Sequence, residues 1–522
     1  MGRRIRWLGL ILVVCFGLVA AQLVNIQLVK AKALQDSPFN PRLAAQRDSN
    51  PRGKILAADG TVLAQSVRTP ASVNSSDYPY HYVRQYPQGP LYSGITGYDS
   101  ALYYGTSGIE QEYDSYLGPH QQAPQTLSQL LFRQSQPTTT DDVTLTVEPS
   151  LQNAAWQALT TLPPGPYNDG AVVVIQPSTG NILAMVSNPT FDPNTLVGTS
   201  LKGEQLAYLS YTGKDHEGFQ YLQPIATGYS FAPGSTMKVV TSTAAYSLKP
   251  SLATFNYPVQ RCQTFSDSNV PLCDQSGPCG GMMTVMLPQS CDPGYAELGV
   301  QVGVPLMTKQ AELFGYNSVP GIDLPNVTKS VWPDLKPNAQ AYLGQSSIGQ
   351  FDVSATALQN AMVAAGVANG GVMMTPHLMS SIHDSQGALV TQYTPKPAAT
   401  VSSPTVAQQV TSLMEGVITN PSGTAAGVGF PAYLCAAVKT GTAQVQIQGA
   451  PTDTWMIGFA PANHPQIAVA VVVPFQSNSL DGAHVAGPIV KAVMQAALPQ
   501  GSVSQPCTVP PVPNSTFTGT GQ

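Results

Sequence analysis

The sequence predicts a mixed α/β (α+β) fold, because β-branched runs and helical segments alternate along most of its 522 residues. The run 171–175 is followed by a Gly-containing turn and the apolar stretch 182–186, a pattern typical of a hairpin of two buried strands. The length allows two or three domains with a large core. Helices are predicted over 149–159, 234–248, 354–368 and 488–497, and further strands over 143–148, 436–439, 454–459 and 467–473.

The N-terminal segment is predicted to be a transmembrane anchor. Residues 7–29 carry no charge, and they follow three arginines: Arg3, Arg4 and Arg6. This arrangement favours a single-pass protein of the cell membrane, with residues 1–6 as a cytoplasmic tail and the remaining domains exported. A cleaved signal peptide is the alternative, although Val19-Ala20-Ala21 makes a poor cleavage site.

Two further domains and a tail are predicted. Apolar residues around Asp59-Gly60 indicate a β-hairpin turn, and a short helix is indicated over 108–114. The polar, aperiodic stretch 134–141 marks a domain junction. The predicted divisions are an N-terminal module at 30–142, a second domain at 143–499 and a disordered Pro-, Ser- and Thr-rich tail at 500–522.

Composition narrows the classes of function. The net charge is −5 and only 10% of the residues are charged, so no basic patch indicates a nucleic-acid partner. Cys15 lies in the apolar N-terminal segment and is interpreted as an apolar filler. Zinc binding is an alternative to disulfides for the rest, but residues 262–291 contain no histidine and no Cys-x-x-Cys. An even number of cysteines in an exported domain favours disulfides, of unknown connectivity, among Cys262, Cys273, Cys279, Cys291, Cys435 and Cys507.

Three short motifs carry the chemistry. In chain order they are Ser235-Thr236-Met237-Lys238, Ser290-Cys291-Asp292 and Lys439-Thr440-Gly441-Thr442. Each motif alone is a weak signal, since Ser-x-x-Lys is expected about once by chance in a chain of this size. Their order makes the set specific, because together they are the equipment of an active-site serine acyltransferase.

Ser235 is the predicted nucleophile, and Lys238 is predicted to be its base. A serine hydroxyl is a poor nucleophile at its ordinary pKa and needs an adjacent base. On a helix, a lysine three residues later lies on the same face. A lysine can be that base only if its pKa is lowered by burial or by a nearby cation, and Lys439 is a candidate for that cation. We also expect Ser235 at a helix N-terminus, where free N–H groups would stabilise an oxyanion.

The motifs and their surroundings resemble a class B penicillin-binding protein, and more narrowly the actinobacterial penicillin-binding protein A type. The resemblance runs from about residue 50 to 498. Besides the three motifs, it rests on these segments: 52–64, 104–117, 177–186, 348–350, 358–359, 369–371, Trp455 and 458–461. It implies the penicillin-binding transpeptidase or serine β-lactamase-like fold, with a central antiparallel sheet flanked by helices. A mostly β pedestal or dimerisation module would precede that domain.

The resemblance also implies roles in the site. Lys439-Thr440-Gly441-Thr442 would lie on an edge strand, where Lys439 supplies positive potential and the hydroxyls of Thr440 and Thr442 bind a substrate carboxylate. Gly441 would allow close approach of the backbone. The oxyanion hole would be the backbone N–H groups of Ser235 and Thr442. Trp455 is expected to pack under the site.

Ser290 and Asp292 complete the expected site. Ser290 would relay a proton between Lys238 and the leaving amine, although it could also be an ordinary loop serine. Asp292 departs from the asparagine that is commoner in this motif. Because an ionised carboxylate only accepts hydrogen bonds, Asp292 should face a substrate N–H or ammonium, or hold Lys238.

The activity implied is that of a peptidoglycan D,D-transpeptidase, which serves cell-wall biogenesis and cell shape. Ser235 would form an acyl-enzyme with a stem peptide ending in D-Ala-D-Ala, an amine would resolve it into a cross-link, and β-lactams would acylate the same serine. No metal or cofactor is expected. One alternative is a hydrolase with the same site, either a D,D-carboxypeptidase or a β-lactamase. Another is a scaffold that activates a glycan polymerase, and the resemblance implies a SEDS-family polymerase as partner.

The cysteines near the second motif give one more prediction. Cys291 is the middle residue of Ser-Cys-Asp, so at least one disulfide should tie the segment 262–291 together near the catalytic cleft. Cys435 lies four residues before Lys439, and strand alternation would put both side chains on one face.

Overall fold

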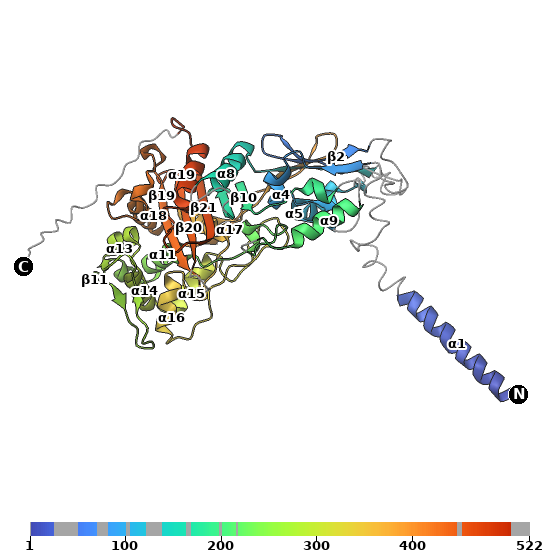
Figure 1. Cartoon of the computed structure of the whole chain (residues 1–522), viewed down its shortest axis with the longest axis horizontal. Coiled ribbons are helices and arrows are strands. Elements are labelled where there is room, and N and C mark those ends of the chain that lie inside the picture. Colours follow the sequence, from blue (N-terminus) through green and yellow to red (C-terminus); the bar gives the residue numbers. More distant parts are fainter. Residues whose placement is uncertain are drawn as a thin grey trace, which may run out of the picture.

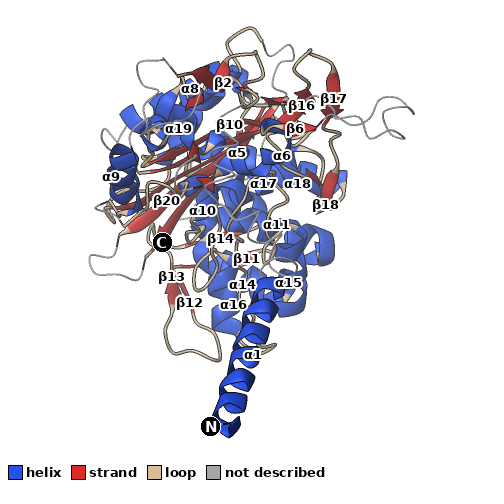
Figure 2. Ribbon diagram, turned by 90° about the vertical axis from the view of Figure 1, so that its right-hand side faces the viewer, coloured by secondary structure: helices blue, strands red, loops and turns tan. Residues whose placement is uncertain are grey.

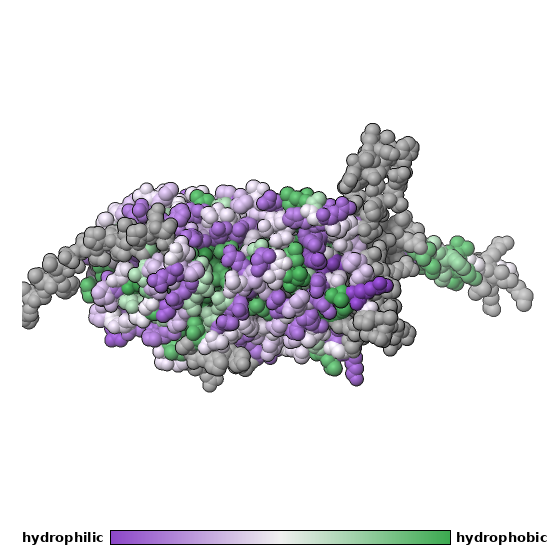
Figure 3. Space-filling view, turned by 90° about the horizontal axis from the view of Figure 1, so that it is seen from above, coloured by the Kyte–Doolittle hydropathy of each residue, from purple (hydrophilic) through white to green (hydrophobic). Residues whose placement is uncertain are grey.

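The computed structural model describes residues 2–25, 51–69, 82–100, 105–121, 138–162, 169–197, 201–215, 218–445 and 451–502. The helix α1 (Gly2–Val24) lies at the N-terminus (Figure 1). Its described side chains are exposed and mostly hydrophobic (Figure 3). Among the described residues, no helix was found to combine the length and apolarity needed to cross a membrane. Most of the predicted tail lies outside the described residues, which end at 502.

The centre of the molecule is a five-stranded sheet in the order β10-β9-β21-β20-β19, and every neighbouring pair is antiparallel. Figure 2 shows β10 and β20 of this sheet in red. The strands are β9 (Gly170–Ile175), β10 (Ile182–Asn188), β19 (Ala437–Gln444), β20 (Thr452–Ala460) and β21 (Ile467–Gln476). The predicted hairpin is confirmed by β9 and β10, and the three predicted C-terminal strands by β19, β20 and β21. The Lys-Thr-Gly segment lies on the edge strand β19, as expected.

Both faces of this sheet are covered by helices, which explains its nearly unbroken apolar strands. Val172 and Val174 pack in one core with α8 (Pro149–Thr161) and α19 (Ala486–Ala497). Ala171 and Val173 point to the other face, into a core that contains the buried helix α17 (Ala357–Ala368). These three helices confirm the predictions at 149–159, 488–497 and 354–368.

A mostly helical region lies beside the sheet and supplies half of the site. The 3₁₀ turn η4 (Gly234–Met237) leads into α11 (Lys238–Leu248), and these two elements replace the single helix expected over 234–248. The other helices of this region are α13 (Met283–Gln289), α14 (Asp292–Val302), α15 (Val304–Leu313), α16 (Gln340–Ser347) and α18 (Pro404–Thr419).

A disulfide-bonded insertion connects α12 (Pro250–Ala253) to α13. It consists of two short antiparallel pairs: β11 (Tyr257–Gln260) with β14 (Cys279–Gly281), and β12 (Cys262–Gln263) with β13 (Leu272–Cys273). The disulfides Cys262–Cys273 and Cys279–Cys291 confirm that this segment is tied together. They also occupy the sulfur atoms that the zinc alternative would need.

Cys435 does not lie on the Lys439 strand, so the expectation that alternation puts both side chains on one face is wrong. It follows the turn η6 (Ala432–Leu434) in a left-handed conformation with φ +46°, and β19 begins only at Ala437. Cys435 is disulfide-bonded. Cys507 lies outside the described residues.

A second sheet of six strands, in the order β17-β16-β8-β1-β2-β3, combines strands of the N-terminal region with β16 and β17 from much later in the chain. Its strands are β1 (Ile55–Leu56), β2 (Val62–Arg68), β3 (Tyr82–Gln85), β8 (Asp142–Leu145), β16 (Met379–His383) and β17 (Leu389–Gln392). The turn predicted at Asp59-Gly60 is confirmed, since β1 and β2 are antiparallel and Gly60 has φ +86°. The predicted boundary at 142/143 falls inside β8, which pairs with β1 and with β16 from far along the chain.

A buried charge cluster holds three segments of this region together. Glu110, fully buried in α5 (Gly108–Glu112), contacts Nε of Arg52 at 2.7 Å and Nε of Arg84 at 2.6 Å. Arg52 also contacts Asp114 at 2.7 Å, and Asp114 begins α6 (Asp114–Leu117). A buried carboxylate between two guanidinium groups is compensated, so this cluster fixes the segments before β1, in β3 and in α5 relative to one another.

Candidate active site

Ser235 lies one residue into η4, and the α-helix begins only at Lys238. The expectation of Ser235 at an α-helix N-terminus is therefore corrected to a 3₁₀ turn, in which Lys238 N donates to Ser235 O. Side chains three residues apart nearly eclipse in a 3₁₀ turn, so Ser235 and Lys238 still share a face. Ser235 lines a cavity, and its hydroxyl has no hydrogen-bond partner among the described residues.

Ser290 has an unusual backbone that aims two of its atoms at the lysines. It follows α13 in the left-handed conformation, with φ 58° and ψ 36°, which non-glycine residues rarely adopt. Its Oγ is 3.2 Å from Lys238 Nζ and 2.8 Å from Lys439 Nζ. Its carbonyl also accepts a hydrogen bond from Lys238 Nζ. Ser290 therefore joins the first and third motifs.

Lys238 is fully buried and paired with a carboxylate. Its Nζ lies 2.6 Å from Oδ1 of Asp292 and 5.7 Å from the ring centre of Tyr295. The sequence leaves open whether Asp292 faces the substrate or holds Lys238, and in the structure it holds Lys238. Asp292 is the first residue of α14, where its N–H donates to Oδ2 of Asp274 at 3.0 Å. Its side chain is 29% exposed and also faces the cavity.

Lys439 is fully buried in β19 and contacts uncharged acceptors. Besides Ser290 Oγ, its Nζ lies 3.0 Å from the carbonyl and 3.4 Å from Oγ1 of Thr440. Burial holds the pKa of Lys439 well below its ordinary value, and the charge of Lys238 lowers this pKa further. The charges of Asp292 and Asp274 act in the opposite direction. The lowered pKa of Lys238 stays a prediction, and in the structure the pKa of Lys439 is lowered.

The remaining residues of the third motif line or support the cavity. Thr440 Oγ1 lies 2.7 Å from Oγ1 of Thr424, and Thr442 Oγ1 accepts a hydrogen bond from Gly482 N at 3.1 Å. A Cβ on Gly441 would lie 2.8 Å from the carbonyl oxygen of Pro233, so this glycine does allow close approach. Trp455 is fully buried, packs edge-on against the ring of Phe231 and donates its indole N–H to the carbonyl of Ala232 at 2.9 Å, three residues before Ser235.

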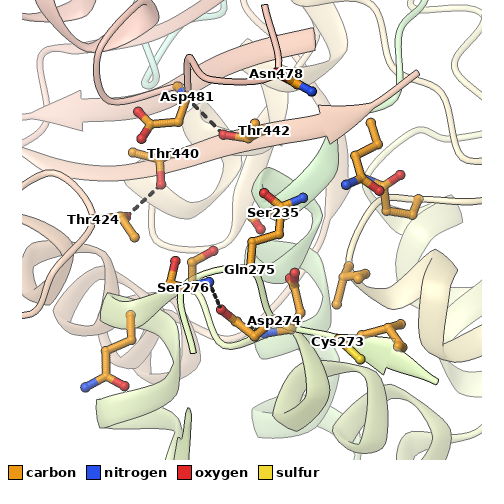
Figure 4. A pocket seen from close by; sticks show the side chains of 18 of the residues that line it. Ser235, Cys273, Asp274, Gln275, Ser276, Thr424, Thr440, Thr442, Asn478 and Asp481 are labelled. Atoms are coloured by element: carbon orange, nitrogen blue, oxygen red, sulfur yellow. Dashed lines mark hydrogen bonds between the residues drawn. The ribbon is translucent and has the colours of Figure 1, made fainter. Parts of the chain in front are cut away.

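These side chains surround one cavity of about 620 Å³ (Figure 4). Ser235 comes from η4, Ser290 and Asp292 from the helical region, and Thr440 and Thr442 from β19. The buried amines of Lys238 and Lys439 lie behind this lining. The site thus combines a hydroxyl nucleophile, two amines joined by a second hydroxyl, and hydroxyl groups on an edge strand, which is suited to acyl transfer.

The sequence alone did not identify several residues of the cavity. The insertion contributes Cys273, Asp274, Gln275 and Ser276, and the loop after β21 contributes residues 478–483 (Figure 4). Only the prediction of a disulfide near the cleft hinted at the insertion. Nothing in the sequence hints at the loop, which reaches the site through Gly482. Asp274 lies near Cys279 and Cys291, a grouping that could suggest a metal site, but both sulfurs are in a disulfide.

Two family models match the chain. The model described as the penicillin-binding protein transpeptidase domain matches residues 170–495, which contain the central sheet and the cavity. The model described as the penicillin-binding protein A dimerisation domain matches residues 52–139.

Relatives match over nearly the whole chain. The peptidoglycan D,D-transpeptidase PbpA of Mycolicibacterium smegmatis is 34% identical over 514 residues, covering 96% of this chain and 100% of the relative. The protein of the same name from Mycobacterium tuberculosis is 33% identical over 488 residues, covering 90% and 94%.

Solved structures agree with this similarity. Penicillin-binding protein A from M. tuberculosis, as a ceftriaxone acyl-enzyme complex, has a TM-score of 0.76 and 31% identity over 87% of this chain and 99% of that one. Its penicillin G acyl-enzyme complex has a TM-score of 0.74 and 30% identity over 86% and 100%.

Proposed function

The chain belongs to the class B penicillin-binding proteins of the penicillin-binding protein A type, and from that premise we propose the roles of its site residues. It is a serine-type peptidoglycan D,D-transpeptidase, and β-lactams form acyl-enzymes with it. Ser235 is the residue acylated, and Lys238, Ser290 and Lys439 are the groups that handle its proton. One observation carries this proposal: Ser290 Oγ bridges the two lysine amines at 3.2 and 2.8 Å in the cavity that Ser235 lines.

In the first step, Ser235 attacks the penultimate carbonyl of a stem peptide and the terminal D-alanine leaves. The backbone N–H groups of Ser235 and Thr442 stabilise the oxyanion. The hydroxyls of Thr440 and Thr442 bind the donor carboxylate, and Asp292 borders the cavity while it holds Lys238. In the second step, an amine of another stem peptide attacks the ester and forms the cross-link.

Labelling with a fluorescent penicillin tests the assignment of Ser235. We expect a covalent adduct on the wild-type chain and none on Ser235→Ala. Ser276→Ala is a matched control, since Ser276 lines the same cavity on the insertion and has no proposed role in the chemistry. Equal labelling of wild type and Ser235→Ala would contradict the assignment.

Transfer and hydrolysis are separated by their products. With a D-Ala-D-Ala peptide and an added amine acceptor, we expect the amide product to increase with acceptor concentration, together with release of D-alanine. A product that stays the free acid at every acceptor concentration would instead indicate a carboxypeptidase.

We also propose that residues 7–29 anchor the chain in the cell membrane, with the N-terminus cytoplasmic and the catalytic domain outside. The uncharged stretch and the arginines before it support this topology. The disulfides of the insertion suit an oxidising compartment outside the cytoplasm. Protease added to protoplasts with an intact cell membrane should degrade the catalytic domain. Full protection of that domain would contradict the topology.

The proposed partner of the anchor and the N-terminal module is a SEDS-family glycan polymerase in the same membrane. The proposed domain divisions are residues 30–142 for the module and 143–499 for the transpeptidase domain. Co-purification of the full-length chain with a co-expressed polymerase tests the partnership, with a chain that lacks residues 1–142 as the comparison.

A further inference from the structure

We propose that Asp274, in the disulfide-bonded insertion, is a positioning residue for the second motif, because it fixes the start of α14 and with it Asp292 and Ser290. The proposal rests on the proposed function and extends it to a residue outside the three motifs. Asp274 itself takes part in no step of the chemistry. Figure 4 shows it on the wall of the cavity, across from Thr440 and Thr442 on β19.

The second motif spans the junction of two helices. On the α13 side, the N–H groups of Ser290 and Cys291 bond carbonyls within that helix. On the α14 side, Cys291 is the N-cap residue, and its side chain makes no capping hydrogen bond. A typical N-cap side chain has an oxygen that accepts an N–H of the first turn. The sulfur of Cys291 is instead bonded to Cys279, so α14 has no cap from its own N-cap residue.

Asp274 supplies the missing cap. Its Oδ2 accepts the N–H of Asp292, the first residue of α14, at 3.0 Å. Its Oδ1 accepts the N–H of Ser276 at 2.9 Å, and its own N–H donates to the carbonyl of Arg261 at 2.8 Å. The residue is only 6% exposed. One carboxylate oxygen is thus bound within the insertion and the other to α14, where a helix N-terminus favours negative charge.

Two disulfides hold the insertion around this carboxylate. Cys273 directly precedes Asp274 and is bonded to Cys262 across the β12–β13 pair. Cys279 follows Asp274 and is bonded to Cys291. Asp274 therefore lies between two cross-linked positions, and one of these cross-links ends on the second motif itself. Because cross-links restrict the conformations of the chain between them, the carboxylate holds the start of α14 more firmly than a free loop would.

This support reaches the groups behind the cavity. Asp292 Oδ1 contacts Nζ of Lys238 at 2.6 Å, and Ser290 Oγ contacts both lysine amines. Only one residue separates Ser290 from Asp292, so a movement of the first turn of α14 displaces both. Catalytic groups lose efficiency when they are displaced by about 1 Å. Loss of the Asp274 bond should therefore slow acylation, while the hydroxyls proposed to bind the substrate carboxylate stay in place on β19.

The test measures acylation by a fluorescent penicillin over a range of concentrations, which separates the affinity of the first complex from the limiting rate. In Asp274→Ala we expect the limiting rate to fall about 10- to 100-fold and the affinity to change less than about threefold. Asp274→Asn keeps a carbonyl oxygen for the N–H of Asp292, so its limiting rate should stay within about threefold of wild type. Equal losses in the two variants, or a loss confined to affinity, would overturn the proposal.

The control is Asp267→Ala, in the same insertion. Asp267 is exposed, and its carboxylate accepts the N–H of Ala341 at 3.0 Å near the start of α16, a helix that carries none of the three motifs. The control removes the same kind of bond, so its limiting rate should match that of wild type. Absence of labelling in wild type would contradict the proposed function. A labelled wild type with equal rates in Asp274→Ala and Asp267→Ala would contradict the role of Asp274 alone.

A second variant applies even if the alanine variant does not fold. Asp274→Leu keeps the branching of the aspartate side chain but accepts no hydrogen bond, and its limiting rate should fall as in Asp274→Ala. Hydrogen exchange of the peptide that contains Asp292 reports the bond itself. Exchange should be faster in Asp274→Leu than in Asp274→Asn, with melting temperatures to show that both are folded. Equal protection in these two variants would contradict the cap.

Discussion

Asp292 and Lys238 form an ion pair behind the cavity, with 2.6 Å between Oδ1 and Nζ. The lysine is fully buried, so its charge requires such a partner. The pair joins the first residue of α14 to the first residue of α11 and occupies one of the two amines near Ser290. A residue whose contact the sequence leaves open therefore decides how charge is distributed in the site.

Removal of the Ser290 hydroxyl should slow acylation without loss of the fold. In Ser290→Gly the left-handed backbone at φ 58° is retained at no steric cost, while the bridge between the two lysines is lost. We expect the rate of acylation by a fluorescent penicillin to fall about 100-fold or more, as for other acid–base groups. Gly should also be tolerated at least as well as Ala in thermal melting. A wild-type rate in Ser290→Gly would exclude the relay.

A methyl group at Gly441 should push β19 away from η4. Its Cβ would lie 2.8 Å from Pro233 O and 2.9 Å from Thr236 Cγ2. We expect Gly441→Ala to destabilise the protein by about 1–3 kcal/mol, typical of overpacking, and to reduce acylation because Thr442 moves relative to Ser235. Gly427→Ala is the matched control, since a Cβ there meets no atom within 4 Å. Denaturant unfolding and labelling rates check both, and equal behaviour of the two variants would contradict the steric argument.

Neutralising Glu110 should destabilise the N-terminal region. In Glu110→Gln, the guanidinium groups of Arg52 and Arg84 lose the charge they share, and we expect a loss of about 3 kcal/mol as for other broken buried pairs. Although burial alone would raise the pKa of Glu110, Arg84 and Arg52 hold it below its ordinary value. The stabilisation from Glu110 is therefore complete above the ordinary pKa of a glutamate. It is lost as the pH falls through the lowered pKa that Glu110 has in the folded protein.

The control for this variant is Glu112→Gln on the same helix, because Glu112 is exposed. Melting temperatures between pH 3 and 8 compare the two. We expect a large decrease for Glu110→Gln at neutral pH, together with a weaker decline at acidic pH than in wild type. Similar melting curves for both variants would show that the cluster does not stabilise the fold.

Asp453 should make the protein less stable as the pH rises. Burial raises the pKa of Asp453 to about 7, above its ordinary value of 3.8. Because the pKa of Asp453 is higher in the folded state, its protonated carboxyl stabilises the fold fully at pH values below the ordinary pKa of an aspartate. That stabilisation is lost as the pH rises to about 7. Asp453→Asn stays neutral and can still accept the hydrogen bond from Phe475 N. Its free energy of unfolding relative to wild type should therefore increase by about 1.4 kcal/mol per pH unit between pH 4 and 7.

Above pH 7 this difference should become constant, since the wild-type carboxyl is then ionised in both states. Asp334→Asn serves as the control because Asp334 is exposed. Denaturant unfolding at several pH values provides the measurement. Parallel pH profiles of wild type and Asp453→Asn would show that Asp453 is ionised normally.

Local pattern was sufficient for most of the central sheet. The β-branched run at Gly170–Ile175 and the turn before Ile182 predict a hairpin because adjacent antiparallel strands need only a short connection. Strands β16 and β17 were not predicted, although Met379–His383 pairs with β8 more than two hundred residues earlier. Such pairing depends on how distant segments pack, which short-range patterns do not contain.

Within the site, the residues with reactive groups were predictable and their surroundings were not. Ser235, Lys238 and Lys439 stand in motifs whose chemistry requires those groups. Asp274 and Gly482 carry no such signal, because one acts by accepting the N–H of Asp292 and the other by donating its own N–H to Thr442. The 3₁₀ turn at Ser235 was also missed, since a three-residue spacing fits both kinds of helix.

The sequence by itself determined the family, the order of the motifs and the reacting groups, because these depend on which residues are present and how they are spaced. Only the tertiary structure decided which lysine is paired with a carboxylate. That depends on the left-handed backbone of Ser290 and on the first turn of α14, which place Asp292 beside Lys238 and leave Lys439 with uncharged partners. Burial and the charge of Lys238 lower the pKa of Lys439, and both causes are properties of the packed chain.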